Sequence, residues 1–178
     1  MIRYHDEVWG RPITGAAEHF ERLVLESFQA GLSWSTILHK LEAFRLAFRG
    51  FDPVVVAAFD DRDRARLMAD AGIVRNRAKI DVAIANARLF LDVVAEFGSF
   101  EAYLASIVPP PPRRLPPTAT DSDVPVTTPD SDALSADLRR RGFRFVGSTI
   151  VYAHMQSIGL VDDHLPGCFR YDGEVVTG

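Results

Sequence analysis

The order of apolar and polar positions predicts a chain of amphipathic helices. Apolar side chains recur every three or four residues along most of the sequence, the spacing that lines one face of a helix. Ser33 and Gly50 are suitable first and last caps for one such stretch. The predicted helices span residues 18–30, 33–50, a short stretch opening at Pro53, 60–71, 75–97, 99–107, 130–141 and 147–158. Because no strand-like alternation is sustained, the predicted fold class is all-α, with seven or eight helices.

Residues 108–129 interrupt this pattern. The segment holds eight of the eleven prolines, four of them consecutive at 109–112. Proline lacks the N–H group that a helix needs, so we expect a long, partly polyproline-like connection. The tail after Gly159 is predicted to be short and irregular. A length of 178 residues fits a single domain, 1–178, built from two helical lobes.

Composition narrows the class of protein. The only cysteine is Cys168, which excludes an internal disulfide. There is no apolar run of about 18 residues that would span a membrane, and the first ten residues lack the apolar region of a secretory signal. We therefore expect a soluble, cytoplasmic protein.

Charge is unevenly distributed along the chain. The net charge of −4 argues against a general binder of polyanions. However, residues 62–88 hold seven basic and three acidic side chains, and a second cluster contains Arg139, Arg140, Arg141 and Arg144. Each cluster is either a solvated helix face or a set of phosphate contacts.

The segment around residues 62–90 is expected to form a helix, a tight turn at Gly72 and a second helix. A glycine there would let backbone amides point outward at the start of a helix, where the helix dipole favours a phosphate. Arg75, Arg77 and Lys79 surround this turn. The segment is either a plain helical hairpin or a helix-hairpin-helix motif, which grips the nucleic-acid backbone without reading its sequence.

Two residues are candidates for a pocket. Glu26 has apolar neighbours on a helix expected to be buried, where an unpaired carboxylate is costly. It is either a surface or capping residue, or an acceptor for an amino group or a protonated ring. Trp34 follows a turn-like stretch, so it either belongs to the core or approaches Glu26 across the corner.

Histidine and cysteine provide a possible metal site. His164 and Cys168 have the H-x3-C spacing that can bind a metal from a turn, and His5 is a further candidate. The other histidines, His19, His39 and His154, are expected to be structural.

Six blocks in order are similar to the DNA-3-methyladenine glycosylase I family of the helix-hairpin-helix superfamily. They are Tyr4–Gly10, Leu25–Trp34, Asp70–Ile80, Ser131–Ser135, Arg141–Ile150 and Val161–Cys168. The resemblance covers almost the whole chain and implies an enzyme that excises 3-methyladenine from alkylated double-stranded DNA. By position, Glu26 is implied to hydrogen-bond the flipped base, while Trp34 stacks on it and Tyr4 is a second pocket aromatic. The turn Gly31-Leu32 is implied to wedge into the gap left in the duplex.

The resemblance also implies a structural zinc ion that ties the two ends of the chain together. His5, His164 and Cys168 match three of its four ligands. The family's fourth ligand is a cysteine in an Arg-Cys-x-Trp block upstream, and this sequence does not contain that block. Zinc is therefore expected with water or a carboxylate such as Asp6 in the fourth position, and an empty site is the alternative.

The chemistry is expected to be hydrolysis without strand cleavage. A methylated, cationic base is already a good leaving group, so recognition matters more than acid catalysis. A lyase needs a nucleophilic amine, and the only lysines are Lys40 and Lys79, the latter interpreted as a phosphate contact.

The alternative function is a catalytically silent DNA-binding module. A metal hydrolase built on His5-Asp6 lacks further ligands at helical spacing. We expect a monomer that releases free 3-methyladenine.

Overall fold

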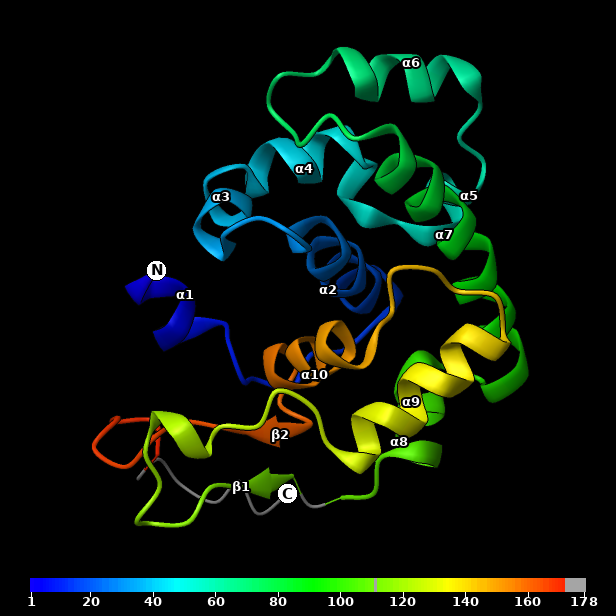
Figure 1. The fold of residues 1–178 in the computed structure, drawn as a ribbon. Coiled ribbons are helices and arrows are strands. Elements are labelled where there is room, and N and C mark those ends of the chain that lie inside the picture. Colours follow the sequence, from blue (N-terminus) through cyan, green and yellow to red (C-terminus); the bar gives the residue numbers. More distant parts are fainter. Residues whose placement is uncertain (111, 172–178) are drawn as a thin grey trace.

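The computed structural model describes residues 1–110 and 112–171, and these residues are mostly helical. The all-α prediction is confirmed (Figure 1). The helices are α1 (Ile2–Glu7), α2 (Ala16–Gln29), α3 (Trp34–His39), α4 (Leu41–Ala47), α5 (Pro53–Ala57), α6 (Asp61–Ala69), α7 (Arg77–Phe97), α8 (Phe100–Ile107), α9 (Pro129–Arg140) and α10 (Ser148–Ser157). Two 3-10 turns, η1 (Arg49–Phe51) and η2 (Asp121–Asp123), and two short strands, β1 (Arg113–Arg114) and β2 (Val161–Asp162), complete the fold.

Helix α2 lies at the centre of the molecule, with α7 and α10 packed against it (Figure 1). All ten residues from His19 to Phe28 are buried, including three charged ones. One of these, Glu21, is neutralised by Arg45 of α4, whose guanidinium nitrogens lie 2.8 and 2.9 Å from its carboxylate. Among the described residues, no comparable ion pair explains the burial of the other two, Arg22 and Glu26.

Capping residues fix most helix boundaries where the sequence predicted them. The side chain of Ser33 accepts a hydrogen bond from the backbone N–H of Thr36, and Asp52 accepts one from Val54 before Pro53 opens α5. The Pro-rich segment contains no α-helix over its described residues 108–110 and 112–128, and its last proline, Pro129, opens α9.

Two predicted helices differ from the structure, and some short elements were not predicted. The single helix expected over 33–50 is wrong, because the chain breaks at Lys40 into α3 and α4. The break lets the Lys40 ammonium donate to the carbonyls of Ala71 and Gly72. Helix α7 begins at Arg77 rather than at 75, since Asn76 caps it by accepting from the N–H of Lys79. Helix α1 and the β1–β2 pair were not predicted, because each is too short to show a period.

The hairpin predicted near residues 62–90 is present as α6, a turn and α7. The apolar side chains of Leu67 and Ile73 hold it against the core. A Cβ atom on Gly72 would lie 2.9 Å from the Cβ of Ala43, so glycine is needed for the turn to pack on α4. The N–H of Gly72 donates to the Asp70 carboxylate at 2.7 Å. The turn therefore satisfies the Gly72 amide internally, and a phosphate contact by neighbouring backbone amides stays a prediction.

The two ends of the described chain meet. Arg170 donates hydrogen bonds to the carbonyls of Asp6 and Trp9, and β1 pairs in parallel with β2. The Tyr171 hydroxyl also donates to the carbonyl of Leu115. These contacts bring α1 next to the C-terminal segment. In the described residues, no helix has both the length and the apolar character needed to cross a membrane.

Candidate functional site

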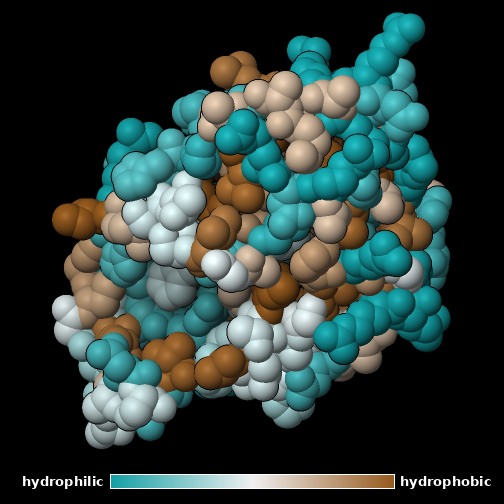
Figure 2. Space-filling view, turned by 45° about the horizontal axis from the view of Figure 1, so that its top comes forward, coloured by the Kyte–Doolittle hydropathy of each residue, from teal (hydrophilic) through white to brown (hydrophobic). Residues whose placement is uncertain are grey.

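A pocket of about 340 Å³ lies between α1, α2, α3 and α10. This volume is in the range of sites that hold small organic molecules. In the space-filling view the left side of the molecule is hollowed, and pale and brown side chains lie around part of the rim (Figure 2). The pocket is lined by Met1, Tyr4, His5, Trp9, Glu26, Gln29, Trp34, Ala153 and Gln156.

Glu26 is the only acidic side chain in this lining, and it is 5% exposed. Burial raises the pKa of its carboxyl to about 8, against the opposing effect of the Arg22 guanidinium one helical turn away. Among the described residues, none donates a hydrogen bond to the carboxylate. A buried acceptor without a protein partner is ready to receive a donor from a ligand. The interpretation of Glu26 as a surface or capping residue is wrong.

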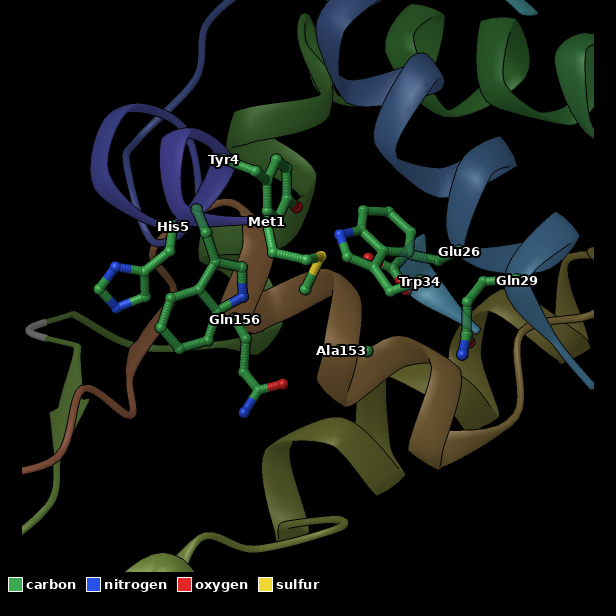
Figure 3. Close-up of a pocket in the computed structure, with 9 residues that line it drawn as sticks. Met1, Tyr4, His5, Glu26, Gln29, Trp34, Ala153 and Gln156 are labelled. Carbon is green, nitrogen blue, oxygen red and sulfur yellow. The ribbon is translucent and has the colours of Figure 1, made fainter. Parts of the chain in front are cut away.

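Two aromatic rings face each other beside Glu26 (Figure 3). The centroids of Tyr4 and Trp34 lie 5.4 Å apart, with their planes tilted by 55°. Trp34 is the first residue of α3 and is only partly buried, and its indole N–H has no partner in the described part of the chain. The chain turns the corner between α2 and α3 at Gly31, where φ is +79°. That corner brings Trp34 to Glu26, the alternative to a purely core position.

Arg22 contacts both the ring and the hydroxyl of Tyr4. Its guanidinium lies 5.7 Å from the centre of the Tyr4 ring, and it donates a long hydrogen bond of 3.5 Å to the hydroxyl. Burial raises the pKa of Tyr4 above its ordinary value, so the phenol stays neutral. Arg22 could not be predicted as a pocket residue from the sequence, because a basic residue on a helix carries no sign that it is buried.

Gln156 was also missed. It reaches the pocket from α10, 130 residues after Glu26. Its side-chain amide donates to the buried carboxylate of Asp163 at 2.8 Å, and the hydroxyl of Tyr152 donates to the same oxygen. Arg113 donates to the other oxygen of Asp163. No local motif marks Gln156, since only the folded chain brings α10 to α2.

The turn Gly31-Leu32 lies at the rim of the pocket. The side chain of Gln29, which lines the pocket, donates to the carbonyl of Leu32 at 2.8 Å. Leu32 is 37% exposed, so its side chain is accessible to a ligand at the surface. Its role as a wedge stays a prediction.

The candidate phosphate contacts divide into two groups. Arg75 and Arg77 are exposed on the hairpin, although Arg77 also pairs with Asp81 at 3.2 Å. Lys79 is buried, and its ammonium donates to the carbonyls of Phe28 and Ala30 at the end of α2. The prediction of Lys79 as a phosphate contact is therefore wrong: it caps the helix that carries Glu26.

The arginines of the second basic cluster also differ in whether they pair with acidic side chains. Arg141 binds Glu96 and Asp137, and Arg140 binds Asp137. Arg141 ties the end of α9 to the end of α7, whereas the Arg140–Asp137 pair lies within α9. Arg144 remains exposed on the connection between α9 and α10.

His5, His164 and Cys168 meet at the junction of the two chain ends. Their ligand atoms all lie within 4.8 Å of one another, and the Nε2 atom of His5 is 3.5 Å from the sulfur of Cys168. Both histidines use Nδ1 to hydrogen-bond a carboxylate, His5 with Asp6 at 2.8 Å and His164 with Asp162 at 2.7 Å. The buried Nε2 of His164 has no partner among the described residues. This arrangement orients both Nε2 atoms toward one point, as carboxylates do for metal-bound histidines.

The other histidines lie away from this cluster. His19 and His154 are buried on α2 and α10, and burial lowers the pKa of His154 to about 3. His39 is exposed at the end of α3.

Comparison with known proteins gives one consistent result. Residues 1–171 match the family model described as methyladenine glycosylase. The chain is 48% identical over 172 residues to DNA-3-methyladenine glycosylase 1 of Escherichia coli strain K12, covering 97% of this chain and 91% of the relative. Its fold is similar to 3-methyladenine DNA glycosylase I from Staphylococcus aureus, with a TM-score of 0.91, 37% identity, and coverage of 98% and 92%. A variant of 3-methyladenine DNA glycosylase I solved in complex with 3-methyladenine gives a TM-score of 0.88 at 38% identity, with coverage of 94% and 89%.

Proposed function

The chain belongs to the methyladenine glycosylase family, and we propose that it hydrolyses the N-glycosidic bond of 3-methyladenine in alkylated double-stranded DNA. The observation that carries this proposal is the carboxylate of Glu26, which is buried, has no hydrogen-bond donor in the described part of the chain and lines the same pocket as the Tyr4 and Trp34 rings. The relatives named for this activity support the reaction class.

The pocket suits a flipped, positively charged base. Extrusion from the stack costs a few kcal/mol, and less for a damaged base. The indole of Trp34 offers a face for stacking, and Glu26 offers a charge-assisted hydrogen bond to the exocyclic amine. Because N3-methylation makes the base cationic, an anionic acceptor in an apolar pocket selects it over normal adenine.

Arg22 has a supporting part in this recognition. Without a nearby cation, a carboxylate as buried as Glu26 would be still harder to ionise. The Arg22 guanidinium opposes that effect only in part, so the carboxyl in the empty pocket is protonated at neutral pH and releases its proton to solvent when the cationic base enters. Water attacks the sugar as the base departs, and the pocket offers no lysine amine for a lyase step.

The duplex is held outside the pocket. We assign Leu32 with Gly31 to the gap left by the flipped base, and Arg75 with Arg77 to phosphates beside the hairpin. We also propose that the protein acts as a monomer, since one chain supplies an aromatic face, a carboxylate and an enclosed pocket for the base. Because its proposed substrate is DNA, we expect the protein to act in the compartment that contains the DNA.

We also propose that His5, His164 and Cys168 bind a structural zinc ion. The unpartnered Nε2 of His164, and the use of both Nδ1 atoms by carboxylates, fit this donor set. Asp6 lies outside the group of converging ligand atoms and orients His5 instead, which leaves water for the fourth position. Bound zinc would fix α1, and with it Tyr4, to the C-terminal segment.

The test is incubation with methylated duplex DNA, followed by chromatography of the released bases. We expect 3-methyladenine in the soluble fraction and abasic sites in unbroken strands. Glu26→Gln keeps the shape of the side chain and should release far less. A silent DNA-binding module would bind the duplex and release no methylated base, and that result would overturn the proposal.

A further inference from the structure

Phe145 has an unusual backbone for a bulky residue. It lies on the connection between α9 and α10 with φ at +53°, a left-handed conformation that side chains other than glycine rarely adopt. The ring is also 38% exposed. Phe51, with φ at +56°, is a useful contrast, because its ring is fully buried and core packing offsets its strain. The exposed ring of Phe145 receives no comparable offset.

The surrounding structure forces this conformation. Phe143 and Val146 on either side are buried in the core. The amide of Asn86, on α7, donates to the carbonyl of Arg144 and accepts from its N–H, at 3.0 and 3.1 Å. The buried hydroxyl of Ser135 donates to the carbonyl of Val146 at 2.7 Å. A strained residue that so many contacts determine is typical of functional sites.

The connection between α9 and α10 also contacts α2, the helix that supplies Glu26 and Gln29 to the pocket. Ser27 follows Glu26 on α2, and its hydroxyl contacts the carbonyl of Phe145 at 3.3 Å. Leu32, the apolar residue at the pocket rim, comes five residues after Ser27. In Figure 1 the α9–α10 connection passes over α2. Two exposed apolar side chains, Leu32 and Phe145, therefore flank the end of α2 where Glu26 and Gln29 line the cavity.

We propose that Phe145 is a second apolar wedge that contacts the DNA duplex beside the base pocket, together with Leu32. The inference rests on the proposed function, because extrusion of a base leaves its neighbours unstacked. An aromatic ring held rigidly in place can stack on such a neighbour at little cost in conformational entropy. The exposed guanidinium of Arg144, the preceding residue, is placed to contact the adjoining phosphate.

The test compares Phe145→Ala, Phe145→Gly and Phe145→Trp with the wild-type protein. Three quantities are measured: kcat/KM for excision from methylated duplex DNA, the affinity for free 3-methyladenine, and the melting temperature. Val54→Ala changes a residue of α5 that is 63% exposed and serves as the matched control.

We expect Phe145→Ala and Phe145→Gly to lower kcat/KM by roughly tenfold or more, the effect of losing one base–aromatic stack. Affinity for the free base should stay within about twofold of wild type, and Phe145→Trp should retain most of the excision activity. Glycine tolerates the left-handed backbone, so Phe145→Gly should melt no lower than wild type.

Two results would overturn the inference. One is wild-type excision by both truncated variants. The other is a parallel loss of free-base affinity and excision, which would mean that Phe145 only supports α2 through Ser27. If the wild-type protein itself released no base, the proposed function would fail instead, so the two failures are distinguishable.

Discussion

Replacing Glu26 by glutamine should stabilise the empty protein, and the gain should grow with pH. Below about pH 4.5 the carboxyl is neutral in both the folded and the unfolded chain. Between 4.5 and about 8 the folded state keeps a proton that the unfolded state releases, because burial raises the pKa of Glu26. The free energy of unfolding therefore falls as pH rises through this window, and it levels off above about pH 8. Glutamine does not titrate, so the free energy of unfolding of the variant lacks this dependence on pH.

The size of the effect follows from the same two values. The gap between 4.5 and about 8, at about 1.4 kcal/mol for each pH unit, sets a ceiling of about 5 kcal/mol, of which about 3 kcal/mol is present at pH 7. Other titrating groups cancel in the difference between variant and wild type. Any constant cost of burying the amide shifts the whole curve without changing its slope.

The assay is urea unfolding of both proteins at intervals from pH 4.5 to 9, with Glu42→Gln on α4 as control. Glu42 is 80% exposed, and its substitution should change stability by no more than about 0.5 kcal/mol at any pH. A Glu26→Gln difference that stays flat from pH 5 to 8 would refute the reasoning, because it would mean that the folded protein does not resist ionisation of Glu26.

Four further predictions concern stacking, the hairpin and the metal. Trp34→Ala should weaken binding of 3-methyladenine by about 1–3 kcal/mol in calorimetry, and unchanged binding would remove Trp34 from the pocket. Lys79→Met leaves two carbonyls of α2 without a donor and should lower the free energy of unfolding by about 1–3 kcal/mol, with an unchanged salt dependence of DNA binding. Arg75→Ala should do the reverse, reducing the salt slope by about one unit with little effect on stability, and a slope equal to wild type would place Arg75 off the DNA. His164→Ala should lower both zinc content by elemental analysis and melting temperature, and less than about a tenth of an equivalent of zinc in the wild-type protein would contradict the metal proposal.

The sequence predicted the helices whose ends are set by capping contacts between neighbouring residues. Helix α6 follows from the cap at Asp60, and α5 from Asp52 and Pro53, since these signals act within one turn. The break at Lys40 was not predictable, because the contact that it allows, with a pair of carbonyls in the hairpin turn, joins residues about thirty positions apart in the sequence. Apolar periodicity alone could not distinguish one long helix from two short ones.

The candidate site shows the same division. The burial of Glu26 could be inferred from its apolar neighbours, and the meeting of His5 with Cys168 from the family resemblance. Lys79 was misassigned because its position beside Arg75 and Arg77 in the sequence hides its contact with the end of α2. Gln156 gave no signal at all, since its importance arises only where α10 crosses α2.

A crystal structure of the protein soaked with 3-methyladenine tests the central claim most directly. We expect the base in the pocket between α1, α2, α3 and α10, stacked on Trp34, with the carboxylate of Glu26 in hydrogen-bonding distance of the exocyclic amine. A base bound elsewhere on the protein, or bound in this pocket with its amine turned away from Glu26, would contradict it.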